Sequence, residues 1–244
     1  MNYLQIKKKA SYYLVFIITM VLVISSCIDD IKDIKDNSPI VTQSFQLEAF
    51  NGIALSIPGN IRIIKGQNQE VEITGREETI NEIKKTVNDG VWDIVLPNNY
   101  HKSYDELDIV ITSNNIEKLI LSGSGKITGE HILPLSNVII SGSGKIEAET
   151  ESSILTSTIS GSGRIDISGK ADELKHNILG SGNLNGFGLE ITDAEVSTSG
   201  SGKSKILVTS NLNVTIIGSG SVYYKGTPTI TTNISGVGQI IDSN

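Results

Sequence analysis

Basic side chains occupy one recurring position in a repeated glycine–serine motif. Each stands directly after a Ser-Gly-Ser-Gly sequence, and the four are Lys126, Lys145, Arg164 and Lys203. If the repeats stack, these side chains form a stripe of positive charge, which would suit an anionic glycan. Glu147 and Asp166 follow two residues after Lys145 and Arg164. Pairing of opposite charges on a solvated face is therefore the alternative interpretation.

A polar loop over residues 97–106 carries a second set of candidate binding groups. It contains Tyr100, His101 and Tyr104, whose rings could stack on a sugar or on a partner surface. Loops carry binding residues more often than the elements that they connect. The alternative is a plain connection whose aromatic rings cover neighbouring side chains.

One repeat gathers the charges that a polysaccharide-degrading enzyme would need. Its acids are Asp166, Asp172 and Glu173, close to Arg164 and Lys170. Glycosidases require two carboxylates that face each other across the bond to be cleaved. Charge is sparse in the neighbouring repeats and no long insertion builds a cleft, so we predict a protein that is not an enzyme.

The sequence predicts neither a metal site nor a cofactor. The three histidines, His101, His131 and His176, are scattered, and Cys27 is the only cysteine. This spacing does not match a metal-ligand cluster. The serines between the glycines lack an accompanying histidine or other base, which argues against a serine nucleophile.

The N-terminus has the features of a bacterial lipoprotein signal. Lys7, Lys8 and Lys9 precede an apolar run over 14–24, and Ser25 and Ser26 precede Cys27. These residues resemble a lipobox, which implies cleavage after residue 26 and lipid attachment, including palmitate, at Cys27. The alternative is an uncleaved anchor with a free thiol. We expect an outer membrane lipoprotein of the cell envelope. Acidic residues soon after Cys27 resemble a surface-export signal, which favours the cell surface, and the periplasmic face is the alternative.

The charge balance excludes nucleic acid as an expected partner. Residues 1–26 contain three lysines and no acid, so their removal leaves 17 basic and 27 acidic side chains, a formal charge of −10. Phosphate binding requires a basic surface. We predict a signal peptide over 1–26, a charged linker over 27–43 and a single domain over 44–244.

The glycine–serine motif has a regular period. Its first glycines are Gly123, Gly142, Gly161, Gly180, Gly200, Gly218 and Gly236, which are 18–20 residues apart. A fixed period near this size is typical of a solenoid in which each repeat forms one coil. Glycine turns the corner, and aliphatic positions such as Ile127, Ile146 and Ile165 fill the interior. We therefore predict an all-β fold, a parallel β-helix, with the repeats over 113–244.

Residues 44–112 lack the repeat and are predicted to form N-terminal coils and a cap. The segment 77–87 places Ile80, Ile83 and Val87 at helical spacing, which indicates one short helix. Such a cap would cover the open apolar core and the unpaired strands at the end of a solenoid. Trp92, the only tryptophan, is predicted to be a core residue of this cap.

The ordered motifs resemble those of the auto-transporter adhesin, head GIN domain family. They are Phe-Asn-Gly-Ile from Phe50, Ile-Arg-Ile-Ile-Lys-Gly from Ile61, Val-Glu-Ile-Thr-Gly from Val71, Asp-Ile-Val-Ile from Asp108 and Leu-Ile-Leu-Ser-Gly-Ser-Gly-Lys-Ile from Leu119. The resemblance covers about residues 44–241. It implies a single-stranded, right-handed parallel β-helix on secreted or lipid-anchored proteins, and the family name implies adhesion.

These observations predict a lipid-anchored, non-catalytic binding or adhesion module. The expected partners are the membrane, through Cys27, and a glycan or an envelope or host surface protein. Two alternatives stay open: a polysaccharide-active β-helix enzyme, and a structural rod that self-associates end to end through the apolar Ile240 and Ile241 of its last coil. The sequence leaves the oligomeric state open.

Overall fold

The computed structural model describes residues 34–244, and residues 35–244 form one compact unit. The predicted signal peptide, the lipid site at Cys27 and the first part of the predicted linker lie outside the described residues. Within 34–244, no helix is long and apolar enough to cross a membrane.

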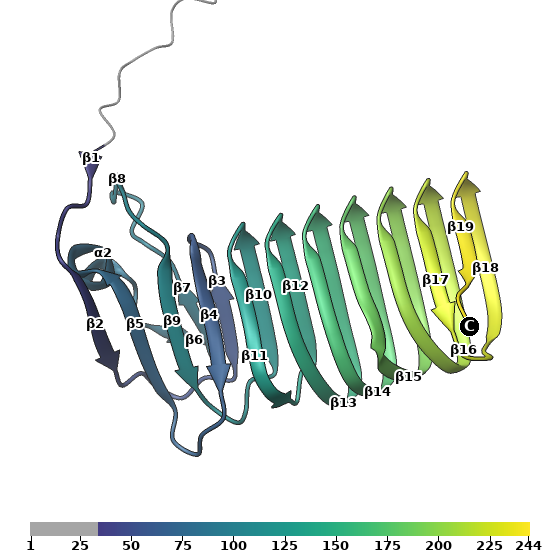
Figure 1. Cartoon of the computed structure of the whole chain (residues 1–244), viewed down its shortest axis with the longest axis horizontal. Helices are drawn as coiled ribbons and strands as arrows, with labels where there is room; N and C mark the ends of the chain where they lie inside the picture. Colours follow the sequence, from purple (N-terminus) through teal and green to yellow (C-terminus); the bar gives the residue numbers. More distant parts are fainter. Residues whose placement is uncertain (1–33) are drawn as a thin grey trace, which may run out of the picture. The chain divides into compact units, whose positions relative to one another are not determined.

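The repeat region is a stack of parallel strands, which makes the chain an all-β solenoid of about 7 turns (Figure 1). Its strands are β10 (Lys118–Gly123), β11 (Lys126–Leu133), β12 (Asn137–Gly142), β13 (Lys145–Gly161), β14 (Arg164–Gly180), β15 (Asn183–Gly200), β16 (Lys203–Gly218), β17 (Ser221–Lys225), β18 (Thr229–Gly236) and β19 (Gln239–Asp242). The predicted period is confirmed, because the register pairs equivalent residues such as Ile146 with Ile165 and Gly161 with Gly180.

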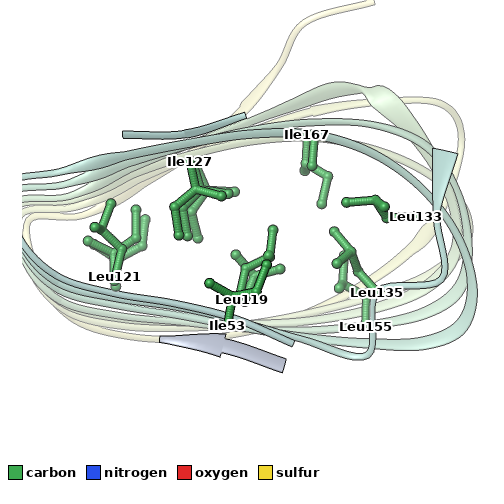
Figure 2. Packing of buried hydrophobic residues seen from close by; sticks show 14 of the residues in the cluster. Ile53, Leu119, Leu121, Ile127, Leu133, Leu135, Leu155 and Ile167 are labelled. Carbon is green, nitrogen blue, oxygen red and sulfur yellow. The ribbon is translucent and has the colours of Figure 1, made fainter. Parts of the chain in front are cut away.

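Aliphatic columns fill the interior of the solenoid. Figure 2 shows Ile127 on one wall opposite Leu119 and Leu121, with Leu133, Leu135 and Leu155 at the other end of the cross-section. All six side chains are fully buried. Each column repeats at the strand spacing of about 4.8 Å, so every side chain packs against its equivalents in the coils on either side.

The glycine–serine motif forms one edge of the solenoid, where the arrowheads of β10, β12 to β16 and β18 end (Figure 1). The first glycine of each of these motifs has a positive φ, between 108° and 130°. The second glycine packs on the core: a Cβ at Gly163 would lie 2.5 Å from Ile140 Cγ2. The motif therefore forms a structural corner of each coil.

The N-terminal part contributes a second group of elements. They are β1 (Ile34–Lys35), β2 (Ile40–Phe45), β3 (Gly52–Leu55), β4 (Gly59–Ile64), β5 (Glu70–Arg76), α2 (Glu77–Glu82), β6 (Val87–Asn88), β7 (Val91–Ile94), β8 (Lys102–Ser103) and β9 (Leu107–Thr112). Helix α2 lies inside the segment predicted to be helical and is shorter, because residue 87 belongs to β6. Trp92 is fully buried, as predicted, and its Nε1 donates to the Lys84 carbonyl at 3.0 Å.

The first coils do not stack in sequence order. Strands β3 and β4 pair in parallel with β10 and β11 on one side, and with β7 and β9 on the other. The later pair, β7 and β9, therefore lies farther from the repeats than the earlier pair. Strand β5 then pairs antiparallel with β9, and β2 pairs antiparallel with β5. The sequence predicted early coils and a cap but not this reversal of order.

The prediction of a linker over 27–43 is wrong for its second half, because residues 36–45 fold onto the domain. Besides forming β2, this segment caps α2. The N–H groups of residues 77–79 donate, in order, to the Pro39 carbonyl, the Ser38 hydroxyl and the Asp36 carboxylate at 3.0, 3.1 and 3.1 Å. Helix N-termini need such acceptors, and here a distant segment supplies all three.

Asp36 is fully buried and has only hydrogen-bond donors around its carboxylate. Burial alone would raise its pKa, but hydrogen bonds from Thr79 and Ser38 outweigh burial and hold the pKa well below its usual range. The Tyr100 hydroxyl also donates to the carboxylate, at 3.2 Å. Because the folded form keeps its negative charge more firmly than the unfolded chain, this stabilisation is present above pH about 4 and is lost as the pH falls further.

We expect Asp36→Asn to lower the free energy of unfolding by about 2–3 kcal/mol, since an amide would turn an N–H group toward at least one of these donors. Limited proteolysis should then cut within 36–45 first. Asp105→Asn is the matched control: Asp105 is half-exposed and pairs with Arg76 at 2.9 Å, so its loss should cost less than about 1 kcal/mol. Equal effects of the two substitutions would contradict the role assigned to Asp36.

Candidate ligand-binding face

The predicted basic stripe lies on one face of the solenoid. The register places Lys126, Lys145 and Arg164 side by side on β11, β13 and β14, and Lys203 follows after Asn183. Toward the N-terminus the same column continues through Asn60 on β4 and Asp108 on β9. The structure therefore assembles the four basic residues in one column, as the repeat predicts.

Carboxylates neutralise the first half of the stripe. Glu147 binds Lys126 at 2.5 Å and also pairs with Lys145, which reaches Asp166 at 2.9 Å. Hydrogen bonds from Lys126 and Lys145 lower the pKa of Glu147, and bonds to Glu147 and Asp166 raise the pKa of Lys145. The amide of Asn185 extends the network by donating to Asp166 at 2.5 Å.

Arg164 and Lys203 differ from the first two cations. Both are exposed, and within residues 34–244 neither has a carboxylate within 4.0 Å. The charge that an anionic ligand would meet is therefore concentrated at these two positions. The ion-pair interpretation therefore describes the first half of the stripe, and ligand binding at Arg164 and Lys203 stays a prediction.

Two adjoining hollows lie at the N-terminal end of the same face. They have volumes of about 470 and 380 Å³ and share Arg62, Glu72 and Val110, which come from β4, β5 and β9. Arg62 donates to Glu130 at 3.0 Å on the side nearest the repeats. The mixture of charged, hydroxyl and aliphatic groups is suited to a polar ligand with an apolar face, such as a sugar. No pattern in the sequence predicts these hollows.

The predicted catalytic cluster is not assembled. Asp172 and Lys170 line a separate hollow of about 360 Å³ with Glu151 and Glu190. Asp166 is held by Lys145 and Asn185, whereas Glu173 pairs with Lys175 at 3.1 Å. The three acids therefore have three different environments, and no pair of them faces a common cavity.

The aromatic residues of the loop over 97–106 pack on their own domain. The Tyr100 hydroxyl lies 2.7 Å from the Thr79 hydroxyl, and the rings of Tyr100 and Tyr104 are 6.0 Å apart, nearly edge to face. Burial raises the pKa of both tyrosines. His101 is exposed beside them. The geometry gives Tyr100 a structural role in holding Asp36, and the Tyr104 ring lies beside the Tyr100 ring.

The residues described by the structure include no group of three or more histidine, cysteine or acidic side chains placed to hold a metal ion. His176 is buried within the core, where its Nδ1 lies 2.6 Å from the Ser157 hydroxyl.

The comparisons agree with the fold. The model of the family described as "Putative auto-transporter adhesin, head GIN domain" matches residues 49–228. The chain belongs to this family. The match takes in the stripe and the smaller hollow, and all of the larger hollow except Ser44, Phe45 and Gln46. No curated protein matches the chain.

Three solved structures share the fold of this head GIN domain. A putative adhesin from Bacteroides fragilis has a TM-score of 0.77 and 23% identity, over 86% of this chain and 100% of its own. A putative lipid binding protein from Parabacteroides distasonis has a TM-score of 0.71 and 22% identity, over 86% of this chain and 99% of its own. A putative adhesin from Parabacteroides merdae has a TM-score of 0.71 and 20% identity, also over 86% of this chain and 99% of its own.

Proposed function

We propose that the chain is a lipid-anchored, non-catalytic binding module of the cell envelope that holds a surface glycan or an envelope or host protein. The observation that carries this proposal is the candidate face, where two hollows adjoin a column of polar and basic side chains on a rigid sheet. The family description supports an adhesive role. The adhesin and lipid-binding descriptions of the solved relatives also agree on binding.

The separation of Asp166, Asp172 and Glu173, the three acids of the predicted catalytic cluster, supports a role without catalysis. A glycosidase needs two carboxylates with different roles across one bond. Here Asp166 belongs to an ion-pair network, while Asp172 lines a different hollow. These contacts favour the binding module over the polysaccharide-active alternative.

The anchor and the location belong to the same proposal. Cleavage after residue 26 and lipid attachment at Cys27 would tie the domain to the outer membrane, and the acids that follow favour its outer face. The folded position of Asp36 makes the free linker shorter than the sequence predicts. We also propose a right-handed coil, since crossovers between parallel strands are right-handed in nearly all proteins.

The stripe gives a direct test with an anionic glycan. Arg164→Ser with Lys203→Ser should weaken binding by about tenfold or more, because each exposed cation contributes on the order of 1 kcal/mol against a dense anionic ligand. Adding Lys126→Ser and Lys145→Ser should change affinity much less, since carboxylates already occupy those two side chains. Binding would be measured by titration calorimetry at low salt.

The control removes equal charge from elsewhere on the molecule. Lys118→Ser with Lys175→Ser takes two cations from β10 and β14 at positions that pair along the other face. This variant should bind the glycan like the unmodified chain. Equal losses in the two double variants would show that only net charge matters, and the stripe would not be the site.

A further inference from the structure

We infer that the glycine edge of the last coils, from β14 to β19, is a contact surface for an anionic lipid bilayer. This inference goes beyond the proposed function and does not depend on the anchor at Cys27. The edge lies where the arrowheads of β14, β15, β16 and β18 end (Figure 1).

Aliphatic side chains protrude from this edge. Leu179 and Ile217 occupy one column, which holds serine in the other repeats, and they are 47% and 57% exposed. Val237 takes the place of the corner serine in the last motif and is 77% exposed. Leu179 and Ile217 are two coils apart, about 10 Å. Large apolar groups at projecting corners are costly in water unless something covers them.

The charge around these residues is opposite to that of the chain. Between Val196 and Ile241 there is no aspartate or glutamate, whereas Lys203, Lys205 and Lys225 lie in this stretch. The whole sequence carries a formal charge of −7. Lys203 and Lys205 are exposed beside the glycine edge, and within residues 34–244 neither has a carboxylate partner within 4.0 Å. The stretch 196–241 therefore carries a formal charge of +3 in an acidic protein.

A bilayer fits this combination better than the other candidates. Aliphatic tips enter the boundary between head groups and acyl chains, while lysines beside them meet anionic phosphates. A glycan would use the cations but would leave the aliphatic tips in water. A second copy docked on the same edge would bring two positively charged regions together. Charge complementarity thus selects the lipid surface.

The opposite side of the coils offers a matched control. Ile132 and Ile154 are 51% and 49% exposed, so the aliphatic exposure is similar. Acids outnumber cations around them: Glu151, Asp172 and Glu190 line the hollow of about 360 Å³ there together with Lys170, and Glu149 borders Ile132. Such a surface is repelled by anionic head groups. Apolar exposure alone would make both sides bind, whereas the inference predicts that only the glycine edge binds.

The test is a fluorescent probe placed in the full-length chain. Cys27→Ser removes the native thiol, and Ser219→Cys or Ser153→Cys adds one exposed thiol, at the glycine edge or beside Ile154 respectively. An environment-sensitive dye is attached and titrated with vesicles of phosphatidylglycerol and phosphatidylcholine, or of phosphatidylcholine alone. The dye at position 219 should shift to the blue on the anionic vesicles, and the dye at 153 should not. Because each dye reports its own surroundings, attachment through residues 1–26 does not mimic the result.

Two further variants separate the contributions. Leu179→Ser with Val237→Ser should weaken the response at position 219 by about tenfold in lipid concentration, from the lost apolar burial. Lys203→Ser with Lys205→Ser should do the same on anionic vesicles, and the response should depend on salt. Equal shifts at positions 219 and 153, or none at 219, would overturn the inference. A shift without vesicles that grows with protein concentration would also overturn it and assign the edge to a second copy.

Discussion

Gly161→Ala is expected to lower the free energy of unfolding by about 2–6 kcal/mol. Gly161 has φ +119°, a conformation that costs an L-residue roughly 1–3 kcal/mol. Its added Cβ would also lie 2.6 Å from the carbonyl oxygen of Gly142 in the preceding coil. Because the contacted atom belongs to the backbone, it cannot move aside as a flexible side chain would. The two stacked coils must then separate locally, which adds about 1–3 kcal/mol to the loss of stability.

Gly123→Ala is the control for this substitution. Gly123 has a similar φ of +108°, but a Cβ there meets nothing within 4 Å, because the preceding coil turns differently. It should therefore cost only the conformational part, about 1–3 kcal/mol. Urea unfolding followed by circular dichroism measures both. If the Gly123 variant is as unstable as the Gly161 variant, the clash of the added Cβ with the preceding coil does not contribute to the loss of stability.

Acidification is expected to remove about 2 kcal/mol of stability between about pH 7.5 and about pH 5, through His176. Its side chain is 2% exposed and occupies an inward column between Ser157 and Val196. Burial lowers its pKa from 6.5 to about 4. Below pH about 6.5 His176 binds a proton in the unfolded chain but stays neutral in the folded chain. Stability therefore falls with pH until about pH 4, where the folded form is protonated as well.

Ser157→Val with His176→Val tests this account. The double substitution removes both hydrogen-bonding partners and continues the column formed by Val138 and Val196. Replacing a buried polar pair by apolar groups of suitable shape is often neutral or stabilising. Over the same pH range the variant should lose about 2 kcal/mol less than the unmodified chain. Parallel pH profiles for the two proteins would contradict the assignment to His176.

The repeat made most of the solenoid predictable. Seven glycine motifs at spacings of 18–20 residues set the coil length, and the aliphatic positions between them set the register. Because like residues stack on like, the alignment of Lys126, Lys145 and Arg164 followed from the spacing alone. The helix at 77–82 and the burial of Trp92 were also predictable from the sequence, since both depend on local pattern and composition.

Features that depend on long-range pairing were not predictable. The position of β7 and β9 outside β3 and β4 depends on which strand edges meet in space, and residues 34–112 carry no repeat to reveal it. Asp36 looked like one of several acids in a charged linker. Only its contacts with Thr79 and Tyr100, 43 and 64 residues away in sequence, distinguish it. The hollows around Arg62 share this origin, because three strands from separate segments form them.

Titration of the full-length chain with a panel of surface glycans, with the chain length of each glycan measured afterwards, tests the central claim most directly. A binding module should bind at least one glycan saturably, lose that binding when Arg164 and Lys203 are replaced by serine, and leave the glycan intact. Sustained shortening of a glycan, lost in an Asp166→Asn or Asp172→Asn variant, would contradict the account and establish the enzyme alternative. Saturable binding that is unchanged when Arg164 and Lys203 are replaced would place the function elsewhere on the solenoid.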